Sequence, residues 1–259
     1  MVSGKPRVLI LHAPGTNRDR EAALACELAG GEAEIVHVNQ LLGRERSLDA
    51  FAMLVLPGGF SYGDDLGAGR LWASDLLHRL WDDVDAFISA GKPVLGICNG
   101  FQALVKAGFL PGAGFERAAT LTHNASGRFE CRWVTLQPVE SSRCLWTGDL
   151  PAPIYCPVAH GEGRFVTKDD PTREALWQRG LVALRYANPC GERVDYPHNP
   201  NGSIDGIAGI CNSAGNVLGL MPHPEDHVFP LQHPRWTRGE AGGLGLPLFQ
   251  RGLQLAREV

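Results

Sequence analysis

The chain has 259 residues, of which 44% are hydrophobic and 20% are charged, and its formal net charge is −4. On a prior of roughly 100–200 residues per domain, this length allows one large domain or two small ones. No excess of Lys and Arg is available to neutralise phosphates, which argues against nucleic-acid binding. The apolar runs are far shorter than the roughly 20 residues of a membrane-spanning helix, so we expect no membrane segment.

Seven cysteines are scattered along the chain without a Cys-x-x-Cys pair. This pattern argues against a zinc ribbon and against a thioredoxin-like redox site. The apolar stretch Val8–Leu11 is too short for a signal peptide. We therefore expect a cytoplasmic protein with free thiols in a reducing compartment.

Apolar runs alternate with amphipathic stretches in the first half of the chain. The runs predict strands, and the amphipathic stretches predict helices. The predicted strands are 7–12, 33–38, 53–56 and 93–97, and the predicted helices are 18–29, 74–90 and 101–107, where the last helix opens. Strands and helices that alternate with short connections indicate a parallel sheet with helices on both faces.

The second half of the chain changes to a pattern typical of antiparallel strands. It predicts strands at 129–136, 181–186, 207–211 and 217–220, with a hairpin-like turn at 212–216, a long loop at 226–245 and a closing helix at 246–258. No linker or internal repeat divides the sequence. We therefore expect one α/β domain over residues 1–259, with a mixed, mostly parallel sheet and additional antiparallel strands in the second half.

The segment Gly96-Ile97-Cys98-Asn99-Gly100 places a cysteine between a predicted strand and a predicted helix. This is the Gly-x-nucleophile-x-Gly arrangement of a nucleophile elbow, with Cys in place of the usual Ser. The glycines suit a sharp turn with close backbone approach, and a helix N-terminus favours a thiolate. Taken alone, the pattern fits a buried cysteine in a tight turn equally well.

A base and an orienting carboxylate are offered by His223 and Glu225 in the segment Met221–Glu225, which follows an apolar strand. We expect His223 to exchange the proton of the Cys98 thiol and Glu225 to hold the imidazole tautomer. Alone, His223 fits a hydrogen-bonded structural histidine. A metal site that adds His227 and His233 is disfavoured, because intervening prolines break the helical spacing of ligands, so we predict none.

Backbone donors for an oxyanion are expected where strand 53–56 runs into a glycine-rich loop. The N–H group of Gly59 or Phe60, together with that of Asn99 after the nucleophile, could form an oxyanion hole. Taken alone, the loop fits a glycine-rich turn without a ligand.

Five separated motifs resemble those of known enzymes. Gly96–Gln102 and Met221–Glu225 resemble the class I, triad-type glutamine amidotransferases, which have a flavodoxin-like α/β fold. Within that class, the chain is most similar to the glutaminase subunits of phosphoribosylformylglycinamidine synthases. The motifs that narrow the resemblance are 57–64, 159–163 and 199–209, and residues 64–73 are closer to the glutaminase portion of the long, fused synthases.

The resemblance implies a glutaminase in which Cys98 attacks L-glutamine. Gly58 and Gln102 would help to hold glutamine, and His160 and Glu162 would lie near the glutamine pocket or the synthetase interface. The implied partner is a synthetase subunit, with or without a small third subunit, that receives ammonia and converts formylglycinamide ribonucleotide to its amidine. ATP and magnesium are expected on that partner, because this chain has no Gly-x-x-x-x-Gly-Lys-Ser/Thr loop, and we expect no cofactor here.

Three other functions fit parts of the pattern. The same chemistry could deliver ammonia to a different acceptor. A cysteine hydrolase or peptidase on a similar sheet would attack peptides or esters instead of free glutamine. A binding or regulatory module could keep the fold and lack the chemistry, although the presence of Cys98, His223 and Glu225 argues against it.

Overall fold

A nine-stranded sheet organises the computed structural model, which describes residues 4–115, 118–151, 153–188, 190, 192 and 194–259. The strands, in their order across the sheet, are β2 (Glu32–His37), β1 (Arg7–His12), β3 (Met53–Leu56), β4 (Val94–Ile97), β11 (Val217–Leu220), β10 (Ile207–Cys211), β9 (Val182–Ala187), β6 (Glu130–Pro138) and β7 (Ile154–His160). The strands from β2 to β11 run parallel, and each later strand is antiparallel to its neighbours. The predicted mixed α/β sheet is confirmed.

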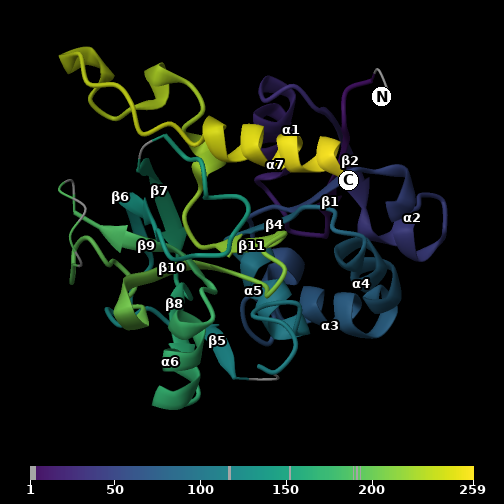
Figure 1. Ribbon diagram of the computed structural model, residues 1–259, viewed down its shortest axis with the longest axis horizontal. Helices are drawn as coiled ribbons and strands as arrows, with labels where there is room; N and C mark the ends of the chain where they lie inside the picture. The colour runs from purple at the N-terminus through teal and green to yellow at the C-terminus, as the bar shows by residue number, and fades with distance from the viewer. Residues whose placement is uncertain (1–3, 116–117, 152, 189, 191, 193) are drawn as a thin grey trace.

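Helices cover both faces of this sheet (Figure 1). One face carries α1 (Asp19–Leu28) and α7 (Leu246–Glu258), and the other carries α3 (Arg70–Arg79), α4 (Trp81–Ser89) and α5 (Asn99–Ala107). The shorter α2 (Val38–Leu42) follows β2, while α6 (Asp170–Gln178) follows a separate two-stranded sheet of β5 (Ala119–Thr122) and β8 (Arg164–Thr167). In the described part of the chain, no helix is both long and apolar enough to cross a membrane.

The prediction of one helix over 74–90 is wrong. The segment forms α3 and α4, which meet at Leu80, where φ is −124° and ψ is 7°. The N–H of Leu80 donates to Asp75, five residues back, instead of continuing the helical ladder. Leu76 and Val84 are nevertheless both buried. The apolar periodicity therefore persists across the break, which is why the pattern did not reveal it.

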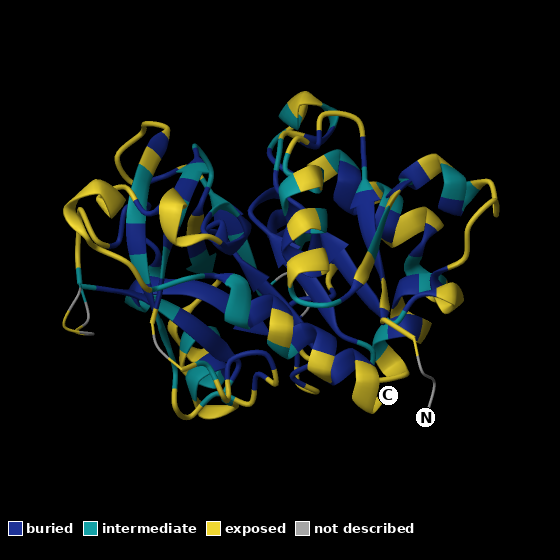
Figure 2. Cartoon of the chain, turned by 90° about the horizontal axis from the view of Figure 1, so that it is seen from above, coloured by how far each residue is buried: buried dark blue, intermediate teal, exposed yellow. Residues whose placement is uncertain are grey.

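Buried strands and close-packed glycines fix α5 against the sheet. Every residue of β3, β4 and β11 is buried, and Figure 2 shows buried strands in dark blue between the helices. A Cβ on Gly219 of β11 would stand 2.1 Å from the Phe101 ring, and one on Gly100 would stand 2.0 Å from Leu56 O. Only glycine at these positions lets α5 approach so closely.

Strands β4 and β11 lie side by side, although they are far apart in the sequence. Their parallel register pairs Val94 with Val217 and Ile97 with Leu220. The next residue, Cys98, donates its N–H to Leu220 O at 2.8 Å. Because parallel strands end at the same edge, the segments that follow β4 and β11 meet there, at the carboxyl ends where α/β sheets form ligand sites.

Candidate active site

Cys98 occupies the sharp turn between β4 and α5. Its backbone has φ 49° and ψ −103°, a combination that residues other than glycine rarely adopt. A Cβ on Gly96 would stand 3.0 Å from the backbone of Gly100, so Gly96 must lack a side chain for the chain to fold back on itself. Cys98 is 5% exposed and lies at the N-terminus of α5. This is the geometry of a nucleophile elbow.

His223 and Glu225 meet the Cys98 thiol from the segment after β11. Glu225 lies in a short 3₁₀ turn, Pro224–Asp226, and its Oε1 is 2.7 Å from His223 Nδ1. The Cys98 thiol lies close enough to the His223 ring to interact with it electrostatically. The three side chains thus form the nucleophile, base and orienter of a triad.

The electrostatics of the triad favour a charged imidazole. Burial alone lowers the pKa of His223, but the negative charges of Glu225 and Cys98 and the hydrogen bond to Glu225 outweigh it and raise the pKa well above its usual value. The backbone N–H of His223 donates to Pro157 O at 2.8 Å, which anchors the histidine to β7.

The glycine-rich loop after β3 contacts the triad through Gly58, and it contacts the loop at residues 15–16 through Gly59 and Phe60. A Cβ on Gly58 would stand 2.6 Å from His223 Cε1, so this glycine makes room for the imidazole. Gly59 has φ +144° and approaches the backbone of Thr16. Phe60 N–H donates to Gly15 O at 3.0 Å.

The free backbone donors are therefore a subset of those predicted. Among the described residues, neither Gly59 N–H nor Asn99 N–H has an acceptor in the protein, whereas Phe60 N–H is already engaged. Sequence alone could not separate Gly59 from Phe60, because the bond to Gly15 joins two distant loops. Gly59 and Asn99 are thus the predicted donors that remain free, and their binding of an oxyanion stays a prediction.

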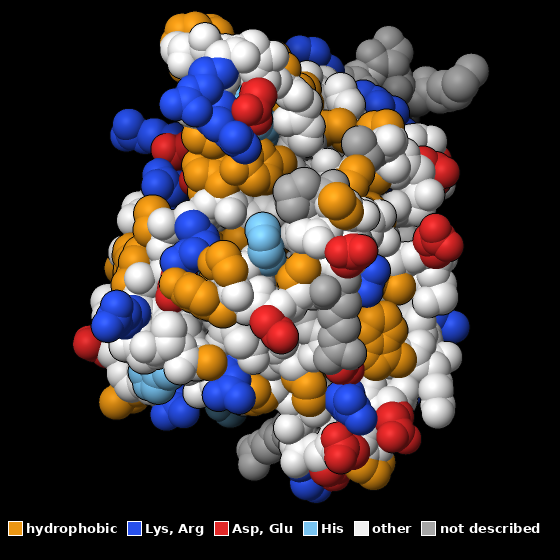
Figure 3. All heavy atoms as spheres, turned by 90° about the vertical axis from the view of Figure 1, so that its left-hand side faces the viewer, with side chains coloured by type: hydrophobic (Ala, Val, Ile, Leu, Met, Phe, Trp, Pro, Cys, Tyr) orange, Lys and Arg blue, Asp and Glu red, His pale blue; other side chains and the backbone are white. Residues whose placement is uncertain are grey.

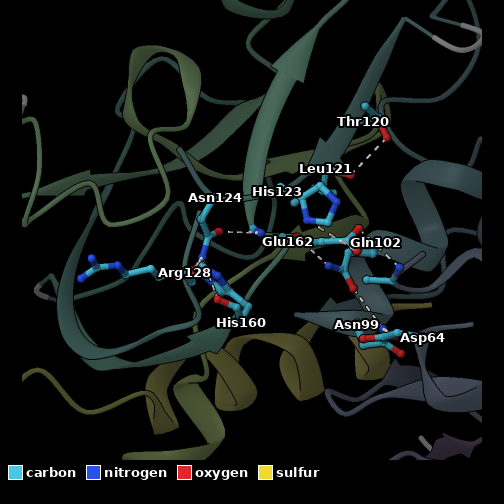
Figure 4. A network of polar contacts seen from close by, with 12 residues as sticks. Asp64, Asn99, Gln102, Thr120, Leu121, His123, Asn124, Arg128, His160 and Glu162 are labelled. Carbon is cyan, nitrogen blue, oxygen red and sulfur yellow. Dashed lines mark hydrogen bonds and ion pairs between the residues drawn. The ribbon is translucent and has the colours of Figure 1, made fainter. Parts of the chain in front are cut away.

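Side-chain amides on α5 tie the nucleophile turn to two loops (Figure 4). Asn99 Oδ1 accepts from Ser61 N–H at 3.0 Å, and its Nδ2 donates to Asp64 Oδ1 and to Gln102 Oε1, each at 3.0 Å. Gln102 Nε2 donates to the backbone oxygen of Glu162 at 2.6 Å. Gln102 therefore positions the segment that carries Glu162, a role that its motif did not indicate.

A pocket of about 240 Å³ opens beside the nucleophile. Its lining residues are Gly59, Phe60, Asp64, Ala68, Cys98, Gln102, His123, Phe129, Ala159, His160, Gly161 and Glu162. Of the predicted substrate-binding residues, Gln102 and His160 line it, while Gly58 packs against His223 instead. Asp64 ends the motif 57–64 but was given no role there, and His123 and Phe129 lie outside every motif. The pocket is assembled from four separate segments, which a sequence does not show to be close together.

His160 is buried in this pocket without a partner for its ring. The residue is 3% exposed, and among the described residues neither ring nitrogen has a hydrogen-bond partner. Burial and the nearby charge of His223 lower the pKa of His160 to about 3, so its imidazole is neutral. Buried polar atoms without partners are uncommon in proteins, and they indicate a place for a ligand or water.

The four residues weighed as metal ligands separate into two groups. Within the described residues, His223, Glu225 and Asp226 have ligand atoms within 4.8 Å of one another, but His223 Nδ1 is already engaged with Glu225. His227 and His233 instead pack with the rings of Trp133 and Tyr155. Burial lowers the pKa of His227, and its Nδ1 contacts Tyr155 O at 2.6 Å.

The segment 226–245 is irregular, as predicted, and contains short 3₁₀ turns at Pro230–Gln232 and Trp236–Arg238. Leu231 and Trp236 are 70% and 51% exposed. Figure 3 shows the face at the β6–β7 end of the sheet, where hydrophobic and basic side chains are interspersed.

A model of the CobB/CobQ-like glutamine amidotransferase domain matches residues 5–255. The chain belongs to this glutamine amidotransferase family. It is 50% identical to phosphoribosylformylglycinamidine synthase subunit PurQ of Treponema denticola, over 96% of this chain and 98% of that protein. It is also 42% identical to the phosphoribosylformylglycinamidine synthase of Drosophila melanogaster, over 86% of this chain but only 17% of that protein.

The structural comparison agrees with the sequence comparison. A chain of the PurLQS structure from Thermotoga maritima superposes with a TM-score of 0.74 and 36% identity, over 96% of this chain and 98% of that one. The family assignment does not favour the cysteine peptidase or the non-catalytic module among the alternatives. The family name indicates that enzymes with this domain transfer the amide nitrogen of glutamine.

Proposed function

We propose that this chain is the glutaminase subunit of a phosphoribosylformylglycinamidine synthase. In this role it hydrolyses L-glutamine to glutamate and delivers ammonia to a synthetase subunit. The observation that carries the proposal is the Cys98–His223–Glu225 triad at the edge of a small pocket. The similarity to subunit PurQ over almost the whole of both chains supports the choice of reaction.

The acylation step follows from the geometry of the triad. The Cys98 thiolate attacks the γ-carboxamide carbon of glutamine, and the N–H groups of Gly59 and Asn99 stabilise the oxyanion. The C–N bond then breaks as the His223 imidazolium gives its proton to the leaving nitrogen, so that ammonia and a γ-glutamyl thioester are formed. Glu225 stabilises the imidazolium before this transfer.

Deacylation reverses the proton transfers. Neutral His223 takes a proton from water, which attacks the thioester carbonyl, and a second oxyanion forms in the same hole. The C–S bond breaks, which restores the thiolate–imidazolium pair. The released γ-carboxyl group loses its proton to solvent, and glutamate leaves the pocket.

In this proposal the partner subunit uses the ammonia that this chain releases. The synthetase subunit, with or without a small third subunit, would use ATP and magnesium to convert formylglycinamide ribonucleotide to its amidine, and this chain would carry no cofactor of its own. We place both subunits in the cytoplasm. The absence of a Gly-x-x-x-x-Gly-Lys-Ser/Thr loop supports this division of labour.

The test is glutamate formation from L-glutamine by wild type, Cys98→Ala and the matched control Cys190→Ala, which removes an exposed thiol. Each is measured alone and with a synthetase subunit, its nucleotide substrate and ATP. We expect turnover that requires Cys98, tolerates loss of Cys190 and rises with the complete mixture. Folded wild-type chain that releases no glutamate in any mixture would contradict the proposal, and cleavage of peptides or esters instead would favour a cysteine hydrolase.

A further inference from the structure

A cleft of about 1190 Å³ lies outside the active-site pocket, and no residue lines both cavities. Helices α3, α4 and the C-terminal end of α5 form its walls, on one face of the sheet (Figure 1). Residues of β5 and of the turn 212–214 complete the lining. The mechanism proposed above uses none of these residues, so the cleft is available for a ligand other than glutamine.

Two cations without carboxylate partners line one end of this cleft. Arg70 begins α3, Lys106 lies in the last turn of α5, and the charge of each acts on the other. In the part of the chain that the structure describes, neither has a carboxylate within 4.0 Å, and Lys106 Nζ donates to Leu121 O at 3.3 Å. Glu162 and Asp64 also act on Lys106, but they line the active-site pocket and not this cleft. An anion in the cleft would relieve the repulsion between the two cations.

Aromatic rings and a carboxylate line the cleft near the other end of α3. Trp81, the first residue of α4, stacks on Phe109 with ring centroids 4.4 Å apart and an interplanar angle of 17°. Asp85 follows Trp81 by one helical turn, so both side chains lie on the same side of α4. Among the described residues, the Asp85 carboxylate has no hydrogen-bond or ion-pair partner. Rings bind planar groups by stacking, and a carboxylate accepts hydrogen bonds from hydroxyl groups.

The length of α3 separates the cationic end of the cleft from the aromatic end. The helix has 10 residues, with Arg70 at its start and Trp81 just beyond its end. At the rise of an α-helix its ends are about 15 Å apart. This spacing suits an elongated molecule with a planar ring at one end, hydroxyl groups next to the ring and negative charge at the other end.

We propose that this cleft binds a nucleoside di- or triphosphate. The base stacks against Trp81, the ribose hydroxyl groups donate to Asp85, and the phosphates lie between Arg70 and Lys106. The bound nucleotide takes no part in the glutaminase reaction, so the proposal is independent of the function proposed above. Inorganic phosphate would reach only the cations and a free nucleoside only the rings, so both should bind more weakly than the nucleotide.

Calorimetric titration of the full chain without a synthetase subunit tests the site, because the ATP expected on that partner is then excluded. The probes are ATP, UTP, adenosine and inorganic phosphate. We expect a nucleotide to bind at least about tenfold more tightly than adenosine or phosphate, and Arg70→Gln and Trp81→Leu to weaken its binding by about tenfold each. The control Arg79→Gln removes an exposed cation of α3 that does not line the cleft, and it should bind nucleotide like wild type.

Three results would overturn the inference. Folded wild-type chain that binds neither ATP nor UTP at millimolar concentration would exclude the site. Phosphate that binds as tightly as the nucleotides would show that the cations form a simple anion site without a role for the rings. Equal nucleotide affinity in wild type and Arg70→Gln would place the nucleotide elsewhere on the chain, and since Arg70 is exposed, this variant tests the proposal even if Trp81→Leu does not fold.

Discussion

The His223 imidazole and the Glu225 carboxylate are 2.7 Å apart and belong to the same short turn, separated by a single proline. They are 3% and 1% exposed, so water stabilises neither charge. A buried pair of this kind is favourable only while both partners are present, because removal of one leaves an uncompensated charge. The elevated pKa of His223 expresses the same coupling.

The first prediction concerns this pair. Glu225→Gln keeps the shape of the side chain but removes the charge that stabilises the imidazolium and fixes its tautomer. We expect kcat for glutamine hydrolysis to fall by roughly 10³-fold or more, with a smaller change in KM. Steady-state ammonia release measures this. Asp226→Asn is the matched control in the same turn, and a Glu225→Gln variant within tenfold of wild type would show that Glu225 does not orient the base.

The second prediction concerns Gly58, where a substitution would displace the His223 imidazole through steric overlap alone. In Gly58→Ala the new methyl group would stand 2.6 Å from His223 Cε1, so the ring must shift from its position in the triad. We expect kcat to drop by about 10²-fold, the order of loss for a misplacement near 1 Å. Gly148→Ala, where a Cβ meets nothing within 4 Å, should behave like wild type. Equal activity of the two variants would contradict the described packing.

Asp226 gives the chain a predictable dependence of stability on pH. Burial, followed by the charge of Glu225, raises the pKa of Asp226 to about 6, and Arg18 Nε lies 3.4 Å from its Oδ2. Because the folded pKa exceeds the unfolded one, the folded state gains stability from the protonated form below about pH 4 and loses it as the pH rises through 6.

Asp226→Asn should therefore match wild type in acid and be more stable above pH 6, by about 1 kcal/mol once partial exposure and the contact with Arg18 are allowed for. Urea unfolding at pH 4 and pH 7.5 provides the measurement. A variant that is less stable than wild type at pH 7.5 would show that the ion pair with Arg18 outweighs the cost of burial.

The strained backbone at Cys98 predicts an unusual order of stabilities. Glycine tolerates φ 49° and ψ −103° better than alanine does, so Cys98→Gly should be more stable than Cys98→Ala by about 1 kcal/mol. The same comparison at Cys26, inside α1, should have the opposite sign, because glycine weakens a helix interior by about 1 kcal/mol. Denaturant unfolding of the four variants checks both orders. The same sign at both positions would argue against strain at the nucleophile.

Sequence patterns located the reactive groups more reliably than their neighbours. The strand limits 53–56, 207–211 and 217–220 and the closing helix 246–258 match the structure, because buried strands and an amphipathic helix have strong periodicities. In contrast, β7 and α6 were not predicted. Buried and partly exposed residues alternate along β7, as is typical of a strand. The sequence did not reveal this strand, because Pro157 lies in its middle and proline is unusual there.

The pocket was harder to derive than the triad. Cys98 and His223 lie in short local motifs, whereas the availability of the Gly59 and Phe60 N–H groups depends on contacts with residues 15–16. Asp64 and Glu162 line the same pocket, and Asn99 and Gln102 connect their loops through hydrogen bonds. Such long-range pairings have no periodicity that one sequence can reveal.

The direct pairing of β4 with β11 also has a consequence for biosynthesis of the enzyme. A growing chain contains Cys98 long before His223 and Glu225 are added, and it gains its base only when β11 inserts beside β4. Nascent and partly folded chains therefore carry a nucleophile without its proton acceptor. Such chains should not hydrolyse glutamine, because His223 reaches Cys98 only after β11 has paired with β4.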